Sequence, residues 1–274
     1  MIREDARTGW SAESGFRFRP MSGRRFGCLL ALAALLFAGG CASADRYSGL
    51  DPDALFQMGQ EAYESRDWSG AVTALERHLS QGPGHIRNPE ARMMLAAAHV
   101  ERGEYILGAA EYERFLQLHP NHGSAPEASI GACRAYEALA PIAPRDQTYT
   151  RQARDACFET AQQFQGLNVA LEAEQIRFRM VERLAEREYA EGRFYQRRGG
   201  HDSAILIFED VVRRYPETQW APMALLAIHN SYNALGWVEE ASEEADRLLR
   251  LYPDSDAARE LREDQGDGGA GAAL

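Results

Sequence analysis

The chain has 274 residues, 45% of them hydrophobic, and a formal net charge of −11 at pH 7. This length allows one elongated domain or two compact domains. The acidic balance repels nucleic acid and anionic lipid head groups, so nucleic acid is not expected among the partners.

The first predicted element is a short apolar segment near the N-terminus. Residues 28–38 form a run of eleven uncharged residues, preceded by two arginines. A helix that spans a bilayer needs about 20 apolar residues, so this segment is too short to span and has the layout of a secretory signal. Residues 1–20 match no targeting signal, which favours a translation start at Met21. We therefore expect a signal peptide over residues 1–40, with 1–20 as a start-site artefact.

A cysteine closes this segment. The sequence AGGC, which ends at Cys41, resembles the lipobox of bacterial lipoproteins, in which the cysteine is lipidated and becomes the new N-terminus. Lipoboxes usually carry leucine where this chain has Ala38, and an ordinary signal peptide cut near Ala44, which would discard the cysteine, is the alternative. The resemblance implies lipidation, including palmitate, at Cys41 and a lipidated linker over residues 41–50. The absence of aspartate after the cysteine favours the outer membrane.

Residues 51–256 carry an internal repeat. Alanine-rich amphipathic segments broken by glycine and proline predict short helices, and no alternating strand pattern is present. Residues 59–83 match residues 192–216 without a gap, and each segment recurs in part 37 residues later. This spacing resembles the tetratricopeptide repeat (TPR), a helix–turn–helix unit of about 34 residues.

The repeat predicts the fold class, an all-α TPR-like solenoid of about five helix pairs with a concave groove. A generic helical bundle is the alternative. Small residues allow the two helices of a pair to approach closely, and large ones fill the space between pairs: Ala71, Gly108, Ala204 and Ala241, and Leu75, Tyr112 and Phe208. The expected repeats are 51–86, 88–122, 124–166 (with an insertion of about ten residues), 168–217 and 219–256. Residues 257–274 are acidic and rich in glycine and alanine, and are predicted to be a disordered tail.

Few residues in the sequence suggest metal binding or catalysis. His119 and His122 flank a Pro-Asn pair at a predicted helix end without a third ligand nearby, so this motif indicates a turn rather than a metal site. No serine or cysteine lies in a nucleophile motif. We expect no catalytic residue, metal or cofactor, and therefore a protein that is not an enzyme.

Two cysteines fall in the third repeat, one on each predicted helix. In an oxidising compartment Cys133 and Cys157 are candidates for a disulfide. Paired helices also place small unbonded cysteines face to face as core residues. The sequence is compatible both with a disulfide and with two unbonded cysteines in the core.

Three longer stretches resemble the BamD family of outer-membrane assembly lipoproteins. They are YERFLQLHPNH (112–122), RDQTYTRQA (145–153) and the segment from RLAEREYAEG to RRYPET (183–218). The order of features agrees over residues 41–256: lipobox, short linker, five repeats and an insertion in the third. The chain departs from the family at QGPGH (81–85) and at FQGLN (164–168).

This resemblance implies a lipid-anchored protein on the periplasmic face of the outer membrane that helps β-barrel proteins to fold and insert. The implied partners are a POTRA-containing barrel insertase similar to BamA, other assembly lipoproteins and unfolded barrel substrates. The family docks its partner through the C-terminal repeats, which makes Arg183, Arg187 and Arg193 docking candidates, with pairing to Glu186 and Glu188 as the alternative. A periplasmic TPR adaptor that coordinates envelope constriction or peptidoglycan synthesis is the rival function.

The family's N-terminal repeats form a groove for extended chains. In register with the repeat, the expected groove residues lie on the first helices of the first two pairs: Phe56, Gln60, Tyr63, Met93 and Val100.

Overall fold

The computed structural model describes residues 47–141 and 145–271, with side chains described as far as residue 265. The predicted signal peptide, Cys41 and most of the 41–50 linker lie outside the described residues. The chain divides into two units, residues 1–50 and 51–274, and all of the helices given below belong to the second.

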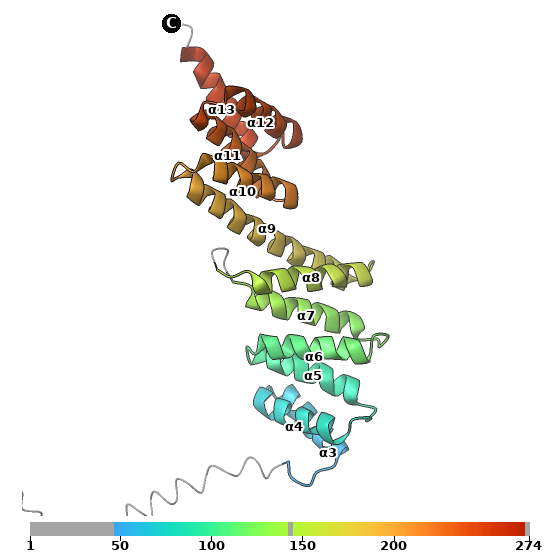
Figure 1. The fold of residues 1–274 in the computed structure, drawn as a ribbon. Helices are drawn as coiled ribbons and strands as arrows, with labels where there is room; N and C mark the ends of the chain where they lie inside the picture. The colour runs from blue at the N-terminus through green and yellow to red at the C-terminus, as the bar shows by residue number, and fades with distance from the viewer. Residues whose placement is uncertain (1–46, 142–144, 272–274) are drawn as a thin grey trace, which may run out of the picture. The chain divides into compact units, whose positions relative to one another are not determined.

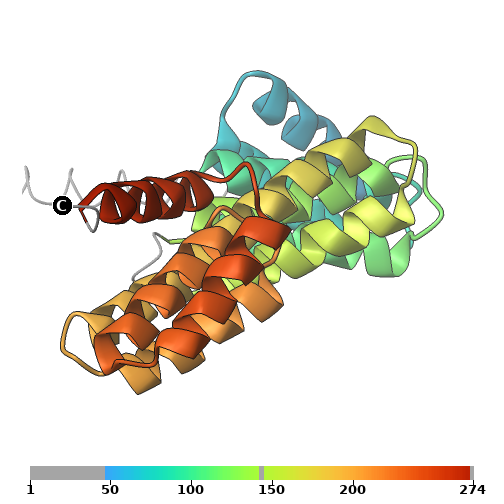
Figure 2. The same cartoon turned by 90° about the horizontal axis from the view of Figure 1, so that it is seen from above.

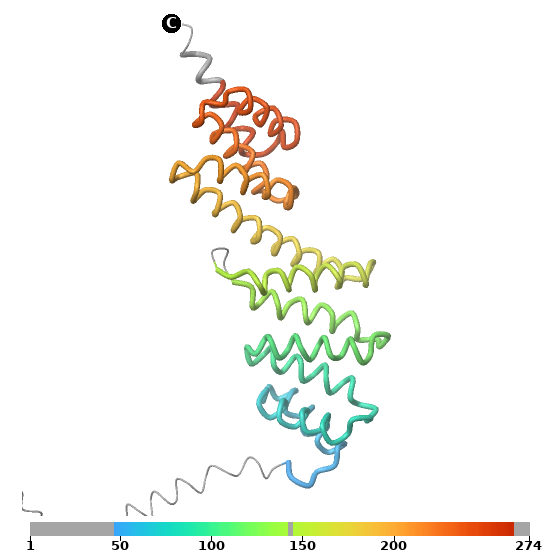
Figure 3. Tube along the Cα trace, viewed as in Figure 1, coloured from blue at the N-terminus to red at the C-terminus, as the bar shows by residue number. Residues whose placement is uncertain are grey.

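The described residues form eleven helices and no strand, stacked in chain order (Figures 1 and 3). Ten of them make five consecutive pairs, and one further helix follows. The helices are α3 (Pro52–Glu64), α4 (Trp68–Gln81), α5 (Asn88–Glu101), α6 (Tyr105–Leu118), α7 (Ala125–Leu139), α8 (Thr148–Gln163), α9 (Asn168–Gln196), α10 (His201–Arg214), α11 (Trp220–Leu235), α12 (Val238–Leu251) and α13 (Asp256–Gly271). The fold is therefore all-α and TPR-like, as the repeat predicts.

Local sequence explains where the helices begin and end. Proline lies in the first turn of α3, α5 and α7, where its missing N–H costs no hydrogen bond. The carboxylate of Asp51 accepts a hydrogen bond from the Ala54 N–H at 2.8 Å, which caps α3. The carboxylate of Asp67 caps α4 in the same way, through the Gly70 N–H at 3.0 Å. Gly236 ends α11 at a φ of +79°, a conformation that glycine adopts without strain.

Large side chains lie over small ones where two helices meet. A Cβ atom at Gly192 would lie 2.5 Å from the ring of Phe208, and one at Gly59 would lie 2.7 Å from the side chain of Leu75. Gly108 leaves room in the same way for Val100 of the preceding helix. The helix pairs are therefore fixed by shape complementarity at single glycines, because a larger residue would overlap its neighbour.

The contacts between helices of successive pairs identify the inner face of the stack. Each first helix (α3, α5, α7, α9, α11) contacts the first helix of the next pair, and α11 contacts α13. In the described part of the chain, the second helices (α4, α6, α8, α10, α12) make no such contacts with one another. The first helices therefore line the inner face of the solenoid.

Helix α9 is about twice as long as its neighbours, with 29 residues. It contacts α7 and α8 of the third pair and also α10 and α11. The Arg183 Nη1 donates to the carbonyl of Ala140 at 2.9 Å, beyond the end of α7. The third and fourth pairs therefore share one continuous helix.

The expected tail after residue 256 is wrong over the described residues. Helix α13 begins at Asp256 and continues to Gly271. Ala257, Ala258 and Leu261 are buried in the core formed by α9 to α12, and this burial stabilises the start of the helix. The C-terminal part of α13 extends away from the other helices in both views (Figures 1 and 2).

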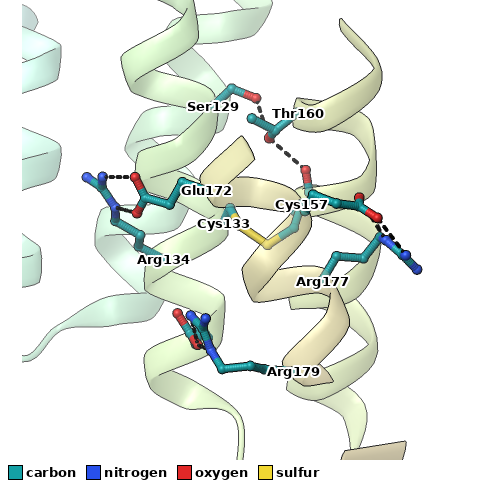
Figure 4. Close-up of a disulfide and its surroundings, with 11 residues drawn as sticks. Ser129, Cys133, Arg134, Cys157, Thr160, Glu172, Arg177 and Arg179 are labelled. Atoms are coloured by element: carbon teal, nitrogen blue, oxygen red, sulfur yellow. Dashed lines mark hydrogen bonds and ion pairs between the residues drawn. A yellow bond between two sulfur atoms is a disulfide. The ribbon is translucent and has the colours of Figure 1, made fainter. Parts of the chain in front are cut away.

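The third pair is joined covalently. Cys133 of α7 and Cys157 of α8 form a disulfide, with their Cα atoms 5.0 Å apart (Figure 4). Both cysteines are completely buried. One turn away, the hydroxyls of Ser129 and Thr160 share a hydrogen bond at 2.7 Å. The bond links the two helices that the insertion separates in sequence; residues 142–144 of that insertion lie outside the described residues.

Among the described residues, no helix combines the length and the hydropathy that crossing a bilayer requires.

Candidate functional site on the inner face

The prolines at the starts of the first helices identify equivalent positions along the inner face. Pro52, Pro89 and Pro126 follow one another at intervals of 37 residues. Eight residues after each proline lie Gln60, Ala97 and Arg134, at equivalent places on α3, α5 and α7. The corresponding positions in the last two pairs are Arg193 on α9 and Asn230 on α11, again 37 residues apart.

Phe56 does not belong to the exposed groove, contrary to the sequence prediction. Only 2% of its surface is exposed. Its ring meets the ring of His78 edge-on, with centroids 5.5 Å apart, and the Arg87 guanidinium lies 4.8 Å from its centroid. The connection between α4 and α5 therefore covers this residue, and a ligand on the inner face cannot reach it.

The other groove candidates differ in exposure. Gln60 is exposed, and its amide donates to the Glu64 carboxylate at 2.9 Å. Tyr63 is half-buried against Trp68, with ring centroids 5.3 Å apart. Met93 and Val100 are also half-buried, Met93 against the core around Phe115. Gln60 is thus the most accessible member of the set, and Tyr63, Met93 and Val100 are partly accessible.

The structure adds a polar cluster that the sequence reading missed. Tyr112 of α6 interacts electrostatically with Tyr63, Glu101 and Arg134, which come from α3, α5 and α7. Burial raises the pKa of Tyr112 to about 12, and the neighbouring Tyr63 and Glu101 add to this while Arg134 opposes it. Charged and phenolic groups from three successive pairs therefore lie within electrostatic range of Tyr112.

Arg134 is the cation of this cluster. It binds Glu172 of α9 through two hydrogen bonds of 2.6 Å, from Nε and Nη2 (Figure 4). This contact lowers the pKa of Glu172, because the guanidinium favours the charged carboxylate. The position of Pro126, 37 residues after Pro89, was the signal in the sequence that places Arg134 in line with Gln60.

The docking candidates on α9 lie in three different environments. Arg183 is half-buried at its bond to the Ala140 carbonyl, Arg187 is exposed, and Arg193 lines a cavity together with residues of α11 and α13. The suggested pairing with Glu188 is wrong, because Glu188 Oε1 instead accepts from Arg214 at 2.6 Å and from the Tyr215 hydroxyl at 2.9 Å.

The HPNH motif is part of the turn between α6 and α7. The His122 Nδ1 accepts a hydrogen bond from the Ser124 N–H at 3.1 Å, as His85 does from the Arg87 N–H one repeat earlier, at 3.2 Å. Burial lowers the pKa of His119, and the nearby His122 and Arg92 lower it further. The described residues contain no group of three histidine, cysteine, aspartate or glutamate side chains suited to holding a metal ion.

The chain is similar to curated outer membrane proteins. Relatives from three bacteria are outer membrane protein assembly factors named BamD. The relative from Caulobacter vibrioides is 28% identical over 232 residues, which cover 81% of this chain and 75% of the relative. That from Vibrio cholerae is 27% identical, covering 84% and 99%, and that from Rickettsia prowazekii is 26% identical, covering 80% and 88%.

The chain is also similar to a solved structure and to a family model. The TPR domain of P58(IPK) is 16% identical, with a TM-score of 0.41, covering 77% of this chain and 54% of that one. The model of the YfiO family, described as outer membrane lipoprotein, matches residues 49–248, from before α3 into α12. This match takes in all five helix pairs and both ends of the inner face, and the chain therefore belongs to the YfiO family of outer membrane lipoproteins.

Proposed function

We propose that this protein is a lipoprotein component of the machinery that folds and inserts β-barrel proteins into the outer membrane. The observation that carries this proposal is the YfiO family match over residues 49–248, together with the BamD assembly factors that match most of the chain. The proposed role is binding and scaffolding without catalysis. A periplasmic adaptor for constriction or peptidoglycan synthesis is disfavoured, since the relatives carry the name of assembly factors.

The proposed anchor is a lipid on Cys41, on the periplasmic side of the outer membrane. Tethering confines the solenoid to a thin layer beside the membrane, which raises its effective concentration toward partners in the same layer. The proposed partners are a POTRA-containing insertase similar to BamA, accessory assembly lipoproteins and unfolded barrel chains.

The N-terminal part of the inner face is the proposed contact for an extended substrate chain. Gln60 and Tyr63 are accessible there, and the cluster of Tyr63, Glu101, Tyr112 and Arg134 supplies aromatic edges with both charges. Tyrosine and arginine are, with tryptophan, the side chains enriched at binding hot spots. The exposed Arg187 on α9 remains a proposed contact for the insertase.

Depletion and complementation test this proposal. Loss of the protein is expected to reduce folded, heat-modifiable barrel proteins in the outer membrane, and the wild-type gene is expected to restore them. A Cys41→Ser variant is expected to restore them poorly at equal abundance, because it lacks the anchor. Normal barrel levels after depletion, accompanied by a division or cell-wall defect, would instead favour the adaptor function.

A further inference from the structure

The turns between successive helix pairs follow one edge of the stack. Consecutive helices run in opposite directions, so the turns within pairs lie at the other edge. The first three turns between pairs are residues 82–87, 119–124 and 164–167. Figure 1 shows all three on the same side of the stack, where α4, α6 and α8 end. We call the surface formed by these three turns the turn edge.

The three turns are close enough to form one surface. His85 of the first turn lines a hollow of about 310 Å³ together with Leu118 and His119 at the second. Phe164 of the third turn packs against the core around Phe115, which lies beneath the second turn. The turn edge is therefore continuous over the first three pairs.

The turn edge exposes aliphatic side chains and carries no carboxylate. Ile86 is 88% exposed, more than any other large hydrophobic side chain in the described part of the chain, and Leu118 and Leu167 are 57% and 48% exposed. None of the three turns contains aspartate or glutamate, although the chain has a net charge of −11. The fourth and fifth turns carry Glu217 and Asp254. Aliphatic tips in line without negative charge are typical of a surface that meets an apolar or membrane phase.

The first of these turns packs beside the start of α3, where the linker from Cys41 arrives. The Nδ1 of His78 donates to the Pro52 carbonyl at 2.7 Å, and the Nε2 of His85 lies 3.2 Å from the Asp53 carboxylate. The eleven positions from Cys41 to Pro52 span at most about 40 Å when fully extended. A lipid on Cys41 therefore keeps this end of the turn edge within reach of the bilayer.

We propose that the turn edge is a membrane contact, in which Ile86, Leu118 and Leu167 enter the interfacial layer of a zwitterionic phospholipid leaflet. Apolar side chains at such tips gain free energy when they leave water for the boundary between head groups and acyl chains. A zwitterionic surface fits because the turns hold a single arginine, Arg87, while the whole chain is acidic and repels anionic lipid. The contact rests on the proposed lipid at Cys41, which supplies the proximity.

This contact fixes the orientation of the solenoid. The ends of the first three pairs that carry the turn edge face the bilayer, and the turns within pairs face away from it. The inner face then opens sideways, along the membrane surface. The competing role of the turn edge is a contact with another protein of the envelope, without entry into lipid.

Depth-dependent fluorescence quenching on the full mature chain tests the proposal. Residues 41–274, with Cys41→Ser and a histidine tag before residue 41, are held on phosphatidylcholine vesicles by a nickel-chelating lipid. An environment-sensitive dye is attached at Gly84→Cys, where a Cβ atom meets nothing within 4 Å, or at the exposed Ser65→Cys in the turn within the first pair. The bonded Cys133 and Cys157 do not react with the dye. Nitroxide on the lipid is expected to quench the dye at position 84 and to leave the dye at position 65 unquenched.

Two matched double variants in the Gly84→Cys chain identify the side chains responsible. Ile86→Ser with Leu118→Ser is expected to lower the ratio of docked to free chain about tenfold for each side chain, the scale of one buried aliphatic group, so that the quenching is lost. Ile106→Ser with Leu107→Ser is the control. These residues are 52% and 51% exposed at the start of α6, on the other edge, and the quenching is expected to stay unchanged.

The tag replaces the natural anchor, so the contact and the anchor are tested separately. No quenching at position 84, equal quenching at positions 65 and 84, or an equal loss with the control variant would overturn the membrane contact. Mass spectrometry of the native mature protein without lipid on Cys41 would overturn the anchor alone.

Discussion

Replacement of Phe208 by alanine is expected to lower the free energy of unfolding by about 3–5 kcal/mol. The Phe208 ring is completely buried, and it lies over Gly192 of α9, where no side chain can move in to fill a cavity. Its centroid is 5.4 Å from that of Tyr189, so the substitution also removes an aromatic contact. The shift of the urea unfolding midpoint, measured by circular dichroism at 222 nm, gives the effect.

Phe194 provides the matched control, because it is a phenylalanine on α9 that is 46% exposed. Phe194→Ala is expected to cost less than about 1 kcal/mol, the range of surface substitutions. A loss for Phe208→Ala no larger than that for Phe194→Ala would show that the fourth pair is not packed around this ring.

Removal of the disulfide has the second large expected effect. The double variant Cys133→Ala, Cys157→Ala is expected to lose about 3 kcal/mol, because the bond closes a loop between residues separated by 24 positions. Alanine is the appropriate replacement, since both sulfurs are buried and a serine hydroxyl would need a new partner. Urea unfolding with and without reductant measures the effect.

Reductant distinguishes the covalent bond from ordinary packing of two cysteines. It is expected to lower the midpoint of the wild-type chain and leave that of the double variant unchanged. Complete alkylation of both thiols in the unfolded protein without reductant would contradict the bond.

The sequence predicted the helix pairs well because their boundaries depend on local chemistry. Proline in a first turn and glycine in a tight turn act within a few residues, so their spacing is visible without tertiary information. The pairing of Gly192 with Phe208 is likewise readable, because it recurs as Gly59 with Leu75.

Features that depend on distant packing were not predictable in this way. Composition alone predicted a disordered tail after residue 256, whereas Ala257, Ala258 and Leu261 are buried and hold the start of α13 against the last pair. The register placed Phe56 on the groove, but the α4–α5 connection covers it. Arg134 joins the polar cluster only because Tyr63, Glu101 and Tyr112 approach from other pairs.

The decisive experiment for the assembly function is co-purification of a tagged copy from gently solubilised outer membranes, followed by quantitative mass spectrometry. We expect recovery of a large barrel protein with POTRA domains in near-equal amount. Recovery of division or peptidoglycan-synthesis proteins without that barrel would contradict the assembly function and leave only the fold in place.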